Sequence, residues 1–178
     1  MILILGNGEL GQKLHTAIPN SVVASRPEFD FTLKEHCDLL IQKYPQPECV
    51  INTVGIVDND VWTNLVTNFV FPAYITMKYL ENTSCHVINV SSASAWWPSY
   101  PELDLKRFSY NIAKKSLSDL GQNLNRIVID HPNKIITTVE PGKFISKMSG
   151  YQGQDIEKIV NCILMAIDSK VHHISLVK

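Results

Sequence analysis

Two side chains in the second half of the chain, Tyr110 and Lys114, have types and a spacing that could carry acid–base chemistry. Residues four positions apart on a helix lie on one face, one turn apart. A free phenol has a pKa near ~10, and a neighbouring ammonium favours the phenolate and lowers that value. A tyrosine placed in this way could pass a proton to a carbonyl oxygen. The pair alone is common, so its meaning depends on the surrounding motifs.

A glycine-rich motif, Gly6-Asn7-Gly8-Glu9-Leu10-Gly11, follows an apolar run and opens a helical stretch. Its first glycine permits a tight turn, its second lets the backbone approach a pyrophosphate, and its third allows close packing of helix and strand. The N-terminus of the helix attracts the anion. Such a turn can serve structure alone, but its place after a first strand favours dinucleotide binding. The residues expected to contact the cofactor here are Gly6, Gly8, Glu9, Leu10 and Gly11.

The end of the second expected strand should discriminate between cofactors, because it lies about twenty residues beyond the glycine turn. An acidic residue there would suit the ribose hydroxyl of NAD, but this chain has Ser25 and Arg26, and its first acid is Glu28. A guanidinium beside a hydroxyl suits a 2′-phosphate. The sequence therefore predicts NADP(H) over NAD(H), and the alternative is an ordinary solvated arginine.

Composition excludes several classes of protein. The 178 residues are enough for one core, and 45% hydrophobic and 19% charged residues are typical of a globular chain. A net charge of −1 without blocks of like charge indicates neither a nucleic-acid nor a membrane partner. The four cysteines form no C-x-x-C pair and the six histidines no H-x-x-x-H pattern, so we expect reduced thiols, no metal and a cytoplasmic protein. The apolar N-terminus is too short for a signal peptide or a membrane span.

The elements that must position these motifs are short apolar strands alternating with helices. We expect strands over residues 2–5, 21–25, 49–54, 86–90, 134–139 and 173–177, and a very short one over 29–31. We expect helices over 9–18, 33–43, 60–81 (kinked at Pro72), 103–125 and 156–167, and a loop over 96–102. This alternation predicts a Rossmann-type α/β fold, a doubly wound parallel sheet between two helical layers, as a single domain over 1–178. Ligands of such sheets bind beyond the carboxyl ends of the strands.

Further motifs follow the glycine turn in a fixed order: Asn52-Thr53-Val54-Gly55, Asn68, Ser91-Ser92, Tyr110 with Lys114, and Pro141-Gly142. That order resembles the short-chain dehydrogenase/reductase family, and the resemblance extends over nearly the whole chain. It implies that Tyr110 is the acid–base residue and that Ser92 hydrogen-bonds the substrate oxygen.

The resemblance also implies roles for the other motifs. Lys114 would bind the nicotinamide ribose and tune Tyr110, while Asn68 would belong to a proton relay. Alone, Asn68 could instead cap or bridge within its helix. The cofactor and the central sheet would be supported by Asn52, Val54 and Gly55, and the nicotinamide would lie beside Pro141 and Gly142.

Several departures from the family pattern stand out. The glycine motif is G-x-G-x-x-G rather than T-G-x-x-x-G-x-G, which is closer to the extended branch of the family. The helix expected between the second and third strands is missing, because Arg26 and Asp30 are only four residues apart. Only residues 144–154 separate Pro141-Gly142 from the last helix, so the substrate cap is minimal. Trp96 and Trp97 could stack on a sugar or aromatic substrate, or pack in an interface or loop.

Two functions follow from these observations. The first is an NADP(H)-dependent oxidoreductase that transfers hydride between the nicotinamide and a carbonyl or alcohol substrate. The second, motivated by the short cap, is a non-catalytic NADP-binding module with a regulatory or interaction role. By resemblance, the helices over 60–81 and 103–125 would form the interface of a homodimer or homotetramer.

Overall fold

A computed structural model describes residues 1–96 and 104–176, and its six strands form one parallel sheet in the order β2-β1-β3-β4-β5-β6. The strands are β1 (Ile2–Leu5), β2 (Val22–Ala24), β3 (Cys49–Asn52), β4 (His86–Val90), β5 (Ile135–Pro141) and β6 (His173–Leu176). The predicted doubly wound parallel sheet is confirmed, and the boundaries of these six strands agree with the expected ones within two residues at every end.

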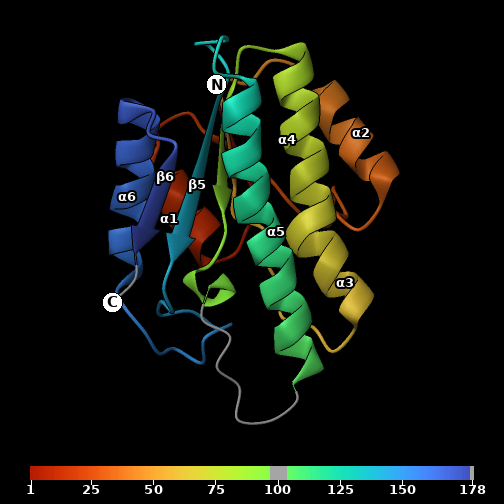
Figure 1. The fold of residues 1–178 in the computed structure, drawn as a ribbon, viewed down its shortest axis with the longest axis vertical. Coiled ribbons are helices and arrows are strands. Elements are labelled where there is room, and N and C mark those ends of the chain that lie inside the picture. The colour runs from red at the N-terminus through yellow and green to blue at the C-terminus, as the bar shows by residue number, and fades with distance from the viewer. Residues whose placement is uncertain (97–103, 177–178) are drawn as a thin grey trace.

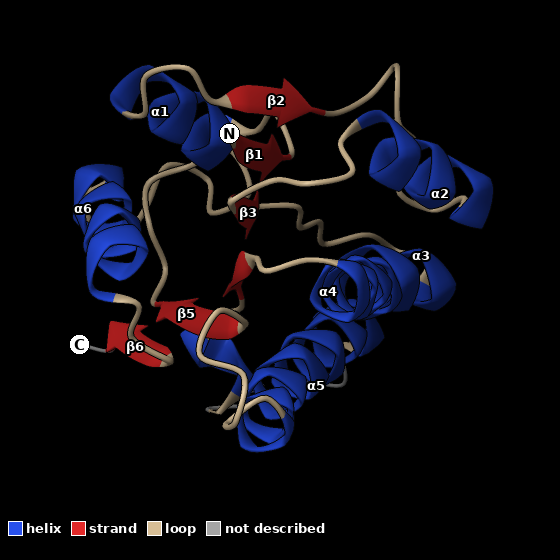
Figure 2. Ribbon diagram, turned by 90° about the horizontal axis from the view of Figure 1, so that it is seen from above, coloured by secondary structure: helices blue, strands red, loops and turns tan. Residues whose placement is uncertain are grey.

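Helices cover both faces of the sheet (Figures 1 and 2). They are α1 (Glu9–Ala17), α2 (Lys34–Lys43), α3 (Val61–Leu65), α4 (Phe71–Asn82), α5 (Leu105–Ile127) and α6 (Ile156–Ser169). Figure 2 shows α1 and α6 on one face and α2, α4 and α5 on the other. None of the helices in the described part of the chain is both long and apolar enough to cross a membrane.

The two faces of the sheet each carry a hydrophobic core, because alternate strand residues point to opposite sides. On the α1–α6 face, Ile4 and Ile51 are fully buried with Ile163 of α6. On the other face, Leu3 and Val50 belong to a core with Leu40 of α2. The central strands are therefore apolar on both sides, as expected for a parallel sheet covered twice. The sheet is a rigid base for the loops at its ends.

The expected strand over residues 29–31 is wrong. Phe29 and Phe31 are buried, but they lie in a turn-rich segment and reach the core from beside the sheet. The ring of Phe31 stacks on Phe71 with centroids 4.3 Å apart, and Phe29 packs against Tyr44. Because β3 is the next strand along the chain, α2 forms the crossover between the second and third strands, so that crossover helix is present after all.

The helix expected over 60–81 has a wider turn in its middle rather than uniform α geometry. Between α3 and α4 lies a π-helical turn, η1 (Val66–Val70), which ends just before Pro72 in the first turn of α4. Proline lacks the N–H that an α-helix needs, and the wider turn accommodates that loss. Asn68, a candidate site residue, lies in this turn.

Candidate active site

The carboxyl ends of four strands meet at one edge of the sheet. Leu5 pairs in register with Ala24 on one side and with Asn52 on the other, and Asn52 pairs with Asn89. The segments that follow these strands therefore begin at the same level. This is the edge at which doubly wound sheets bind ligands.

The glycine turn joins β1 to α1, and packing within the protein requires two of its glycines. Gly6 has φ +101°, a conformation that residues with a side chain rarely adopt. A Cβ added at Gly11 would lie 2.1 Å from the carbonyl oxygen of Gly6, so only glycine lets α1 approach β1 this closely. Leu10 is buried in the core, which leaves only its backbone for a ligand.

Gly8 is different, because nothing in the protein requires a glycine there. A Cβ added at Gly8 would meet no atom within 4 Å, and its φ of −74° suits any residue. Gly8 is also the N-cap of α1, where no side chain accepts a hydrogen bond from the N–H groups of the first turn. N–H groups at the start of a helix, with open space beside the capping residue, suit a pyrophosphate.

At the end of β2, Arg26 is exposed and makes no ion pair with any described residue. The Ser25 hydroxyl donates to the Arg26 carbonyl oxygen at 3.1 Å. The Arg26 charge contributes to lowering the pKa of Asp30, after the larger effect of hydrogen bonds from Thr32. The guanidinium therefore lies at the predicted place beyond the second strand, and its ability to bind a 2′-phosphate stays a prediction.

The segment after β3 is held by a chain of buried amides. The Asn52 Oδ1 accepts a hydrogen bond from the Val54 N–H at 3.2 Å, and its Nδ2 donates to the Asn89 Oδ1 at 3.3 Å. The Asn89 amide in turn donates to Thr76 of α4 at 3.0 Å. Asn52 therefore fixes the backbone of the turn and ties it to the next strand, and its role in supporting the cofactor stays a prediction.

Lys114 is the buried cation of this edge. Its Nζ donates to the Val90 carbonyl oxygen at 2.9 Å and to the Val54 carbonyl oxygen at 3.3 Å, and its side chain is almost completely buried. Burial lowers the pKa of Lys114 to about 7. An ammonium has three N–H donors, and no described residue accepts a hydrogen bond from the third one. A Cβ added at Gly55 would lie only 3.4 Å from the Nζ, so this glycine leaves the amine room.

Tyr110 lies one turn before Lys114 on α5, as the spacing predicts. The Lys114 Nζ is 6.0 Å from the centroid of the half-buried Tyr110 ring. Trp96, a predicted substrate contact, is 39% exposed, and the Lys115 Nζ lies 3.8 Å from the centroid of a Trp96 ring. Trp97 falls outside the described residues. Tyr110 and Lys114 thus form one unit, while the Trp96 ring is partly covered by a lysine.

Asn68 makes hydrogen bonds to backbone on both sides of its amide. Its Oδ1 accepts from the Ile56 N–H at 3.0 Å, and its Nδ2 donates to the Ile56 carbonyl at 2.8 Å and the Asn64 carbonyl at 2.9 Å. The side chain therefore bridges the π-helical turn to the segment after β3. Only the bond to Asn64 is a bridge within the helix; the two bonds to Ile56 were not expected, and a role in a proton relay stays a prediction.

Ser92 lies at the end of β4, where it caps the short 3₁₀ helix η2 (Ala93–Ala95). Its Oγ accepts from the Ser94 N–H at 3.2 Å and lies 2.8 Å from the Ser94 Oγ. The Ser94 hydroxyl donates to the Asn111 Oδ1 at 3.0 Å, so the proton between the two serines comes from Ser92. The neighbouring Ser91 donates to the Lys114 carbonyl oxygen at 2.7 Å and thereby holds α5 against β4.

The turn after β5 leads into a short, internally bonded loop. Gly142 donates its N–H to the Leu176 carbonyl at 3.2 Å, directly after Pro141 at the end of β5. Farther along, the Lys147 N–H donates to the Glu9 Oε2 at 2.9 Å. The loop is thus attached to the first residue of α1, and the Glu9 carboxylate, expected to contact the cofactor, is engaged within the protein.

Neither a family model nor a curated protein sequence matches this chain. Solved structures do match over nearly its full length. BdcA in complex with NADPH has a TM-score of 0.81 at 11% identity, covering 98% of this chain and 91% of its own. A 4-hydroxyisoleucine dehydrogenase complexed with NADH and succinate has a TM-score of 0.79 at 15% identity, covering 99% and 97%. A short-chain dehydrogenase from Burkholderia cenocepacia, in complex with NADP, also reaches 0.79 at 15%, covering 99% and 88%. This chain has the short-chain dehydrogenase fold.

At this edge of the short-chain dehydrogenase fold, the sequence motifs did not predict one set of contacts. Asn64 is fully buried, and its Nδ2 donates to the Asp58 carbonyl at 2.8 Å and to the Ser109 hydroxyl at 2.9 Å. It therefore ties the segment after β3 to α5. Asn64 and Asn68 are four residues apart, and that spacing on a helix could have indicated their shared face. No group of three histidines, cysteines or acids that could hold a metal occurs in the described residues.

Proposed function

We propose that the protein is an NADP(H)-dependent oxidoreductase that acts on a carbonyl or alcohol substrate with Tyr110 as its acid–base residue. The observation that carries this proposal is the position of Lys114. Its amine is buried between the ends of β3 and β4, faces Gly55 and lies under the Tyr110 ring. Among the described residues, only backbone carbonyls accept hydrogen bonds from this amine. Burying a lysine in this way is costly, and a bound ligand that accepts from its third N–H would explain why the burial is kept.

The residues of this edge fit a nicotinamide dinucleotide. When bound, that cofactor would supply or accept the hydride. The N–H groups at the start of α1 would hold the pyrophosphate in the space in front of Gly8. Lys114 would hold the ribose next to the nicotinamide, and Gly55 and Gly142 would let backbone come close to it. The solved structures with this fold bind NADPH, NADH and NADP, so the fold itself accepts both cofactors.

Proton transfer would involve Tyr110 and Lys114. The charged form of Lys114 favours the tyrosinate, so the proton of Tyr110 would pass to the substrate oxygen more readily with the lysine protonated. Ser92 would hold that oxygen by turning its hydroxyl from Ser94 toward the substrate. Asn68 would keep the turn after β3 in place beside the lysine.

The proposed activity is tested by NADPH oxidation against a panel of aldehydes, ketones and keto sugars. Wild type should oxidise NADPH with at least one substrate, and Tyr110→Phe should lower kcat by about 100-fold or more, since general acid–base catalysis contributes that much. Tyr74→Phe removes a phenolic hydroxyl from the surface of α4 and is the matched control. Equal rates for wild type and Tyr110→Phe on a turned-over substrate would disprove the acid–base role.

We further propose that Arg26 selects NADP(H) over NAD(H) by pairing with the 2′-phosphate. Arg26→Glu should weaken NADPH binding by about tenfold or more while leaving NADH binding equal or tighter, because a carboxylate repels the phosphate. Lys158→Glu makes the same charge change at an exposed site on α6 and should leave the ratio of affinities unchanged. An unchanged ratio in Arg26→Glu would remove Arg26 from the cofactor site.

One observation favours the second function, a module that binds NADP without turnover. The Ser92 proton is engaged by Ser94, so the hydroxyl does not point outward as a substrate donor in this state. Tight NADPH binding without oxidation on the whole panel would support this module and count against the oxidoreductase.

We also propose that the chain forms a homodimer or homotetramer through α3, α4 and α5. Large apolar side chains are exposed along these helices and at the end of η1, at Trp62, Val70, Met77, Phe108 and Ile112. Large apolar surface exposed on a monomer marks interfaces. Light scattering should give a mass of two or four chains for wild type and one chain for Phe108→Glu, and a monomeric wild type would contradict the proposal.

A further inference from the structure

The loop between β5 and α6, residues 143–154, is bonded mainly to itself. Its two ends pair with each other, since the Ile145 N–H donates to the Gln154 carbonyl at 2.9 Å and the Gln154 N–H donates to the Lys143 carbonyl at 2.9 Å. At its tip, the Tyr151 N–H donates to the Ser146 carbonyl at 2.8 Å. These bonds give the loop a shape that does not depend on contacts with the other elements.

A single hydrogen bond attaches the tip of this loop to the start of α1. The Lys147 N–H donates to the Glu9 Oε2 at 2.9 Å, and in the described part of the chain no other hydrogen bond joins residues 143–154 to another element. Met148 and Tyr151 are 53% and 65% exposed, so burial of apolar surface contributes little to holding the tip. The Glu9 carboxylate is therefore the main attachment of the tip to α1.

This attachment brings a negative charge to the place proposed for the pyrophosphate. Glu9 is the first residue of α1 and follows the capping residue Gly8. Among the described residues, no lysine, arginine or histidine forms an ion pair with the Glu9 carboxylate. Like charges at close range repel each other. The carboxylate in this position therefore opposes a phosphate at the start of α1.

The Lys147 N–H is a donor whose present acceptor is anionic. A carboxylate oxygen and a phosphate oxygen accept the same kind of charge-assisted hydrogen bond. Backbone N–H groups in turns and at helix N-termini are common ligands of phosphate groups. The Lys147 side chain is also exposed and forms no ion pair with a described residue, so it adds positive charge near the same place. The free protein thus binds its own carboxylate with a donor that suits a phosphate.

We propose that the contact between Glu9 and Lys147 is an autoinhibitory latch on the cofactor site. In the free protein, the Glu9 carboxylate holds the loop against α1 and lowers the affinity for dinucleotides. When a dinucleotide binds, one of its phosphate oxygens replaces the carboxylate at the Lys147 N–H, and the Glu9 side chain turns to solvent. The loop is then attached to the cofactor instead of α1. This inference rests on the proposed function, because it takes the carboxyl edge to be the dinucleotide site.

The latch is tested by calorimetric titration of NADPH into wild type and Glu9→Gln. The glutamine keeps an oxygen that can accept from the Lys147 N–H but removes the charge. NADPH should therefore bind to Glu9→Gln about tenfold more tightly than to wild type. The gain should become smaller as the salt concentration is raised, because salt screens the repulsion.

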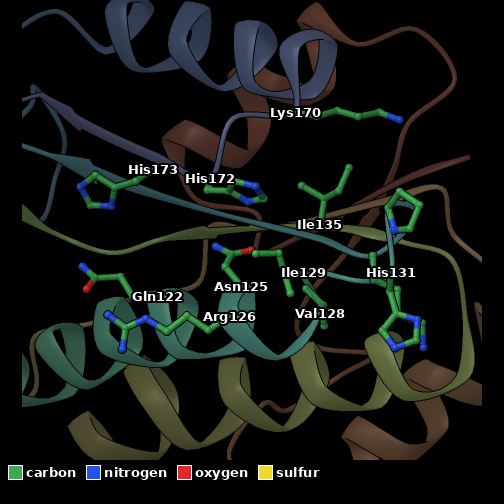
Figure 3. A pocket seen from close by; sticks show the side chains of 12 residues that line it. Gln122, Asn125, Arg126, Val128, Ile129, His131, Ile135, Lys170, His172 and His173 are labelled. Atoms are coloured by element: carbon green, nitrogen blue, oxygen red, sulfur yellow. The ribbon is translucent and has the colours of Figure 1, made fainter.

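Glu81→Gln is the matched control, because it removes the same charge at the opposite edge of the sheet. Glu81 lies near the end of α4, next to Leu80, whose carbonyl accepts a hydrogen bond from the Lys134 amine. Lys134 lines the pocket of about 560 Å³ shown in Figure 3, at the amino ends of β5 and β6. That pocket includes no residue of the loop or of the glycine turn. Glu81→Gln should bind NADPH like wild type.

NMR of the ¹⁵N-labelled full chain reports on the latch itself through the amide signal of Lys147. Without cofactor, that signal should differ between wild type and Glu9→Ala, because the alanine removes the acceptor of its hydrogen bond. Adding NADPH to wild type should also shift the Lys147 signal, because the acceptor changes from a carboxylate to a phosphate.

Three outcomes would count against the latch. If wild type binds NADPH and Glu9→Gln binds it equally or more weakly, the latch is overturned and the proposed function stands. A Lys147 amide signal that is the same in wild type and Glu9→Ala would also overturn the latch alone. An absence of NADPH binding in wild type and Glu9→Gln would overturn the proposed function, and the latch with it.

Discussion

Lys114 and His86 are both buried bases whose pKa is lowered by burial, yet they lie in different surroundings. His86 belongs to the amino end of the sheet, where its Nε2 lies 2.8 Å from the Thr137 hydroxyl. Lys114 belongs to the carboxyl edge, where two backbone carbonyls accept from its amine and a glycine leaves room beside it. A neutral histidine with a hydroxyl partner is a satisfied core residue. A buried lysine whose third donor meets no acceptor among the described residues, with a glycine beside its amine, is what a ligand site would need.

The largest expected effect is on the pH dependence of stability and comes from Lys114. Its pKa is about 7 in the folded state and near ~10.5 when unfolded, so the unfolded state binds more protons between these values. The stability of wild type should therefore rise from pH 7 to pH 10.5, by at most about 5 kcal/mol from this group. Lys114→Met should lack that rise.

Urea denaturation of both proteins across this pH range measures the difference and removes the common contributions of other groups. Parallel stability curves for wild type and Lys114→Met would show that the lysine is not held in a lowered-pKa state.

His86 should give a smaller effect at lower pH. Its pKa falls from about 6.5 to about 4 on folding. Between these pH values, the unfolded state therefore binds a proton that the folded state does not bind. Wild type should lose up to about 3 kcal/mol of stability as the pH falls from 6.5 to 4. His86→Gln should reduce that loss, as measured by denaturation at matched pH values, and an unchanged pH dependence would contradict the burial argument.

The glycine turn should show a smaller contrast between two of its own positions. Gly11→Ala forces a Cβ against the Gly6 carbonyl and should cost about 1–3 kcal/mol, the usual cost of overpacking. Gly8→Ala meets no neighbour and should cost no more than about 1 kcal/mol, the size of the N-cap preference for glycine over alanine. Thermal unfolding of the two variants checks this, and equal losses would show that the turn is packed differently.

Much of the fold could be predicted from the sequence because apolar strand runs and helical periodicity are local patterns. The glycine turn and the i, i+4 spacing of Tyr110 and Lys114 are local as well, and the structure places them at one edge. The strand expected over residues 29–31 was wrong because alternating aromatic residues are typical of a strand. In the structure, Phe29 and Phe31 lie in a turn and are buried by contacts with the Tyr44 and Phe71 rings.

Other features depended on partners far away in the chain. Asn68 is hydrogen-bonded to Ile56, and Asn64 to Ser109. No local sequence pattern predicts such pairs. Side-chain contacts between residues far apart in the chain therefore could not be predicted from the sequence.

The central claim, that the carboxyl edge holds a nicotinamide cofactor, is tested most directly by calorimetric titration of NADPH into wild type and Gly8→Leu. Gly8 faces open space, so the leucine should lower the unfolding temperature only by the small N-cap preference while filling the place proposed for the pyrophosphate. We predict a loss of affinity on the order of 100-fold, about 2.7 kcal/mol. Equal affinity in the two proteins, or no binding to wild type, would contradict the account.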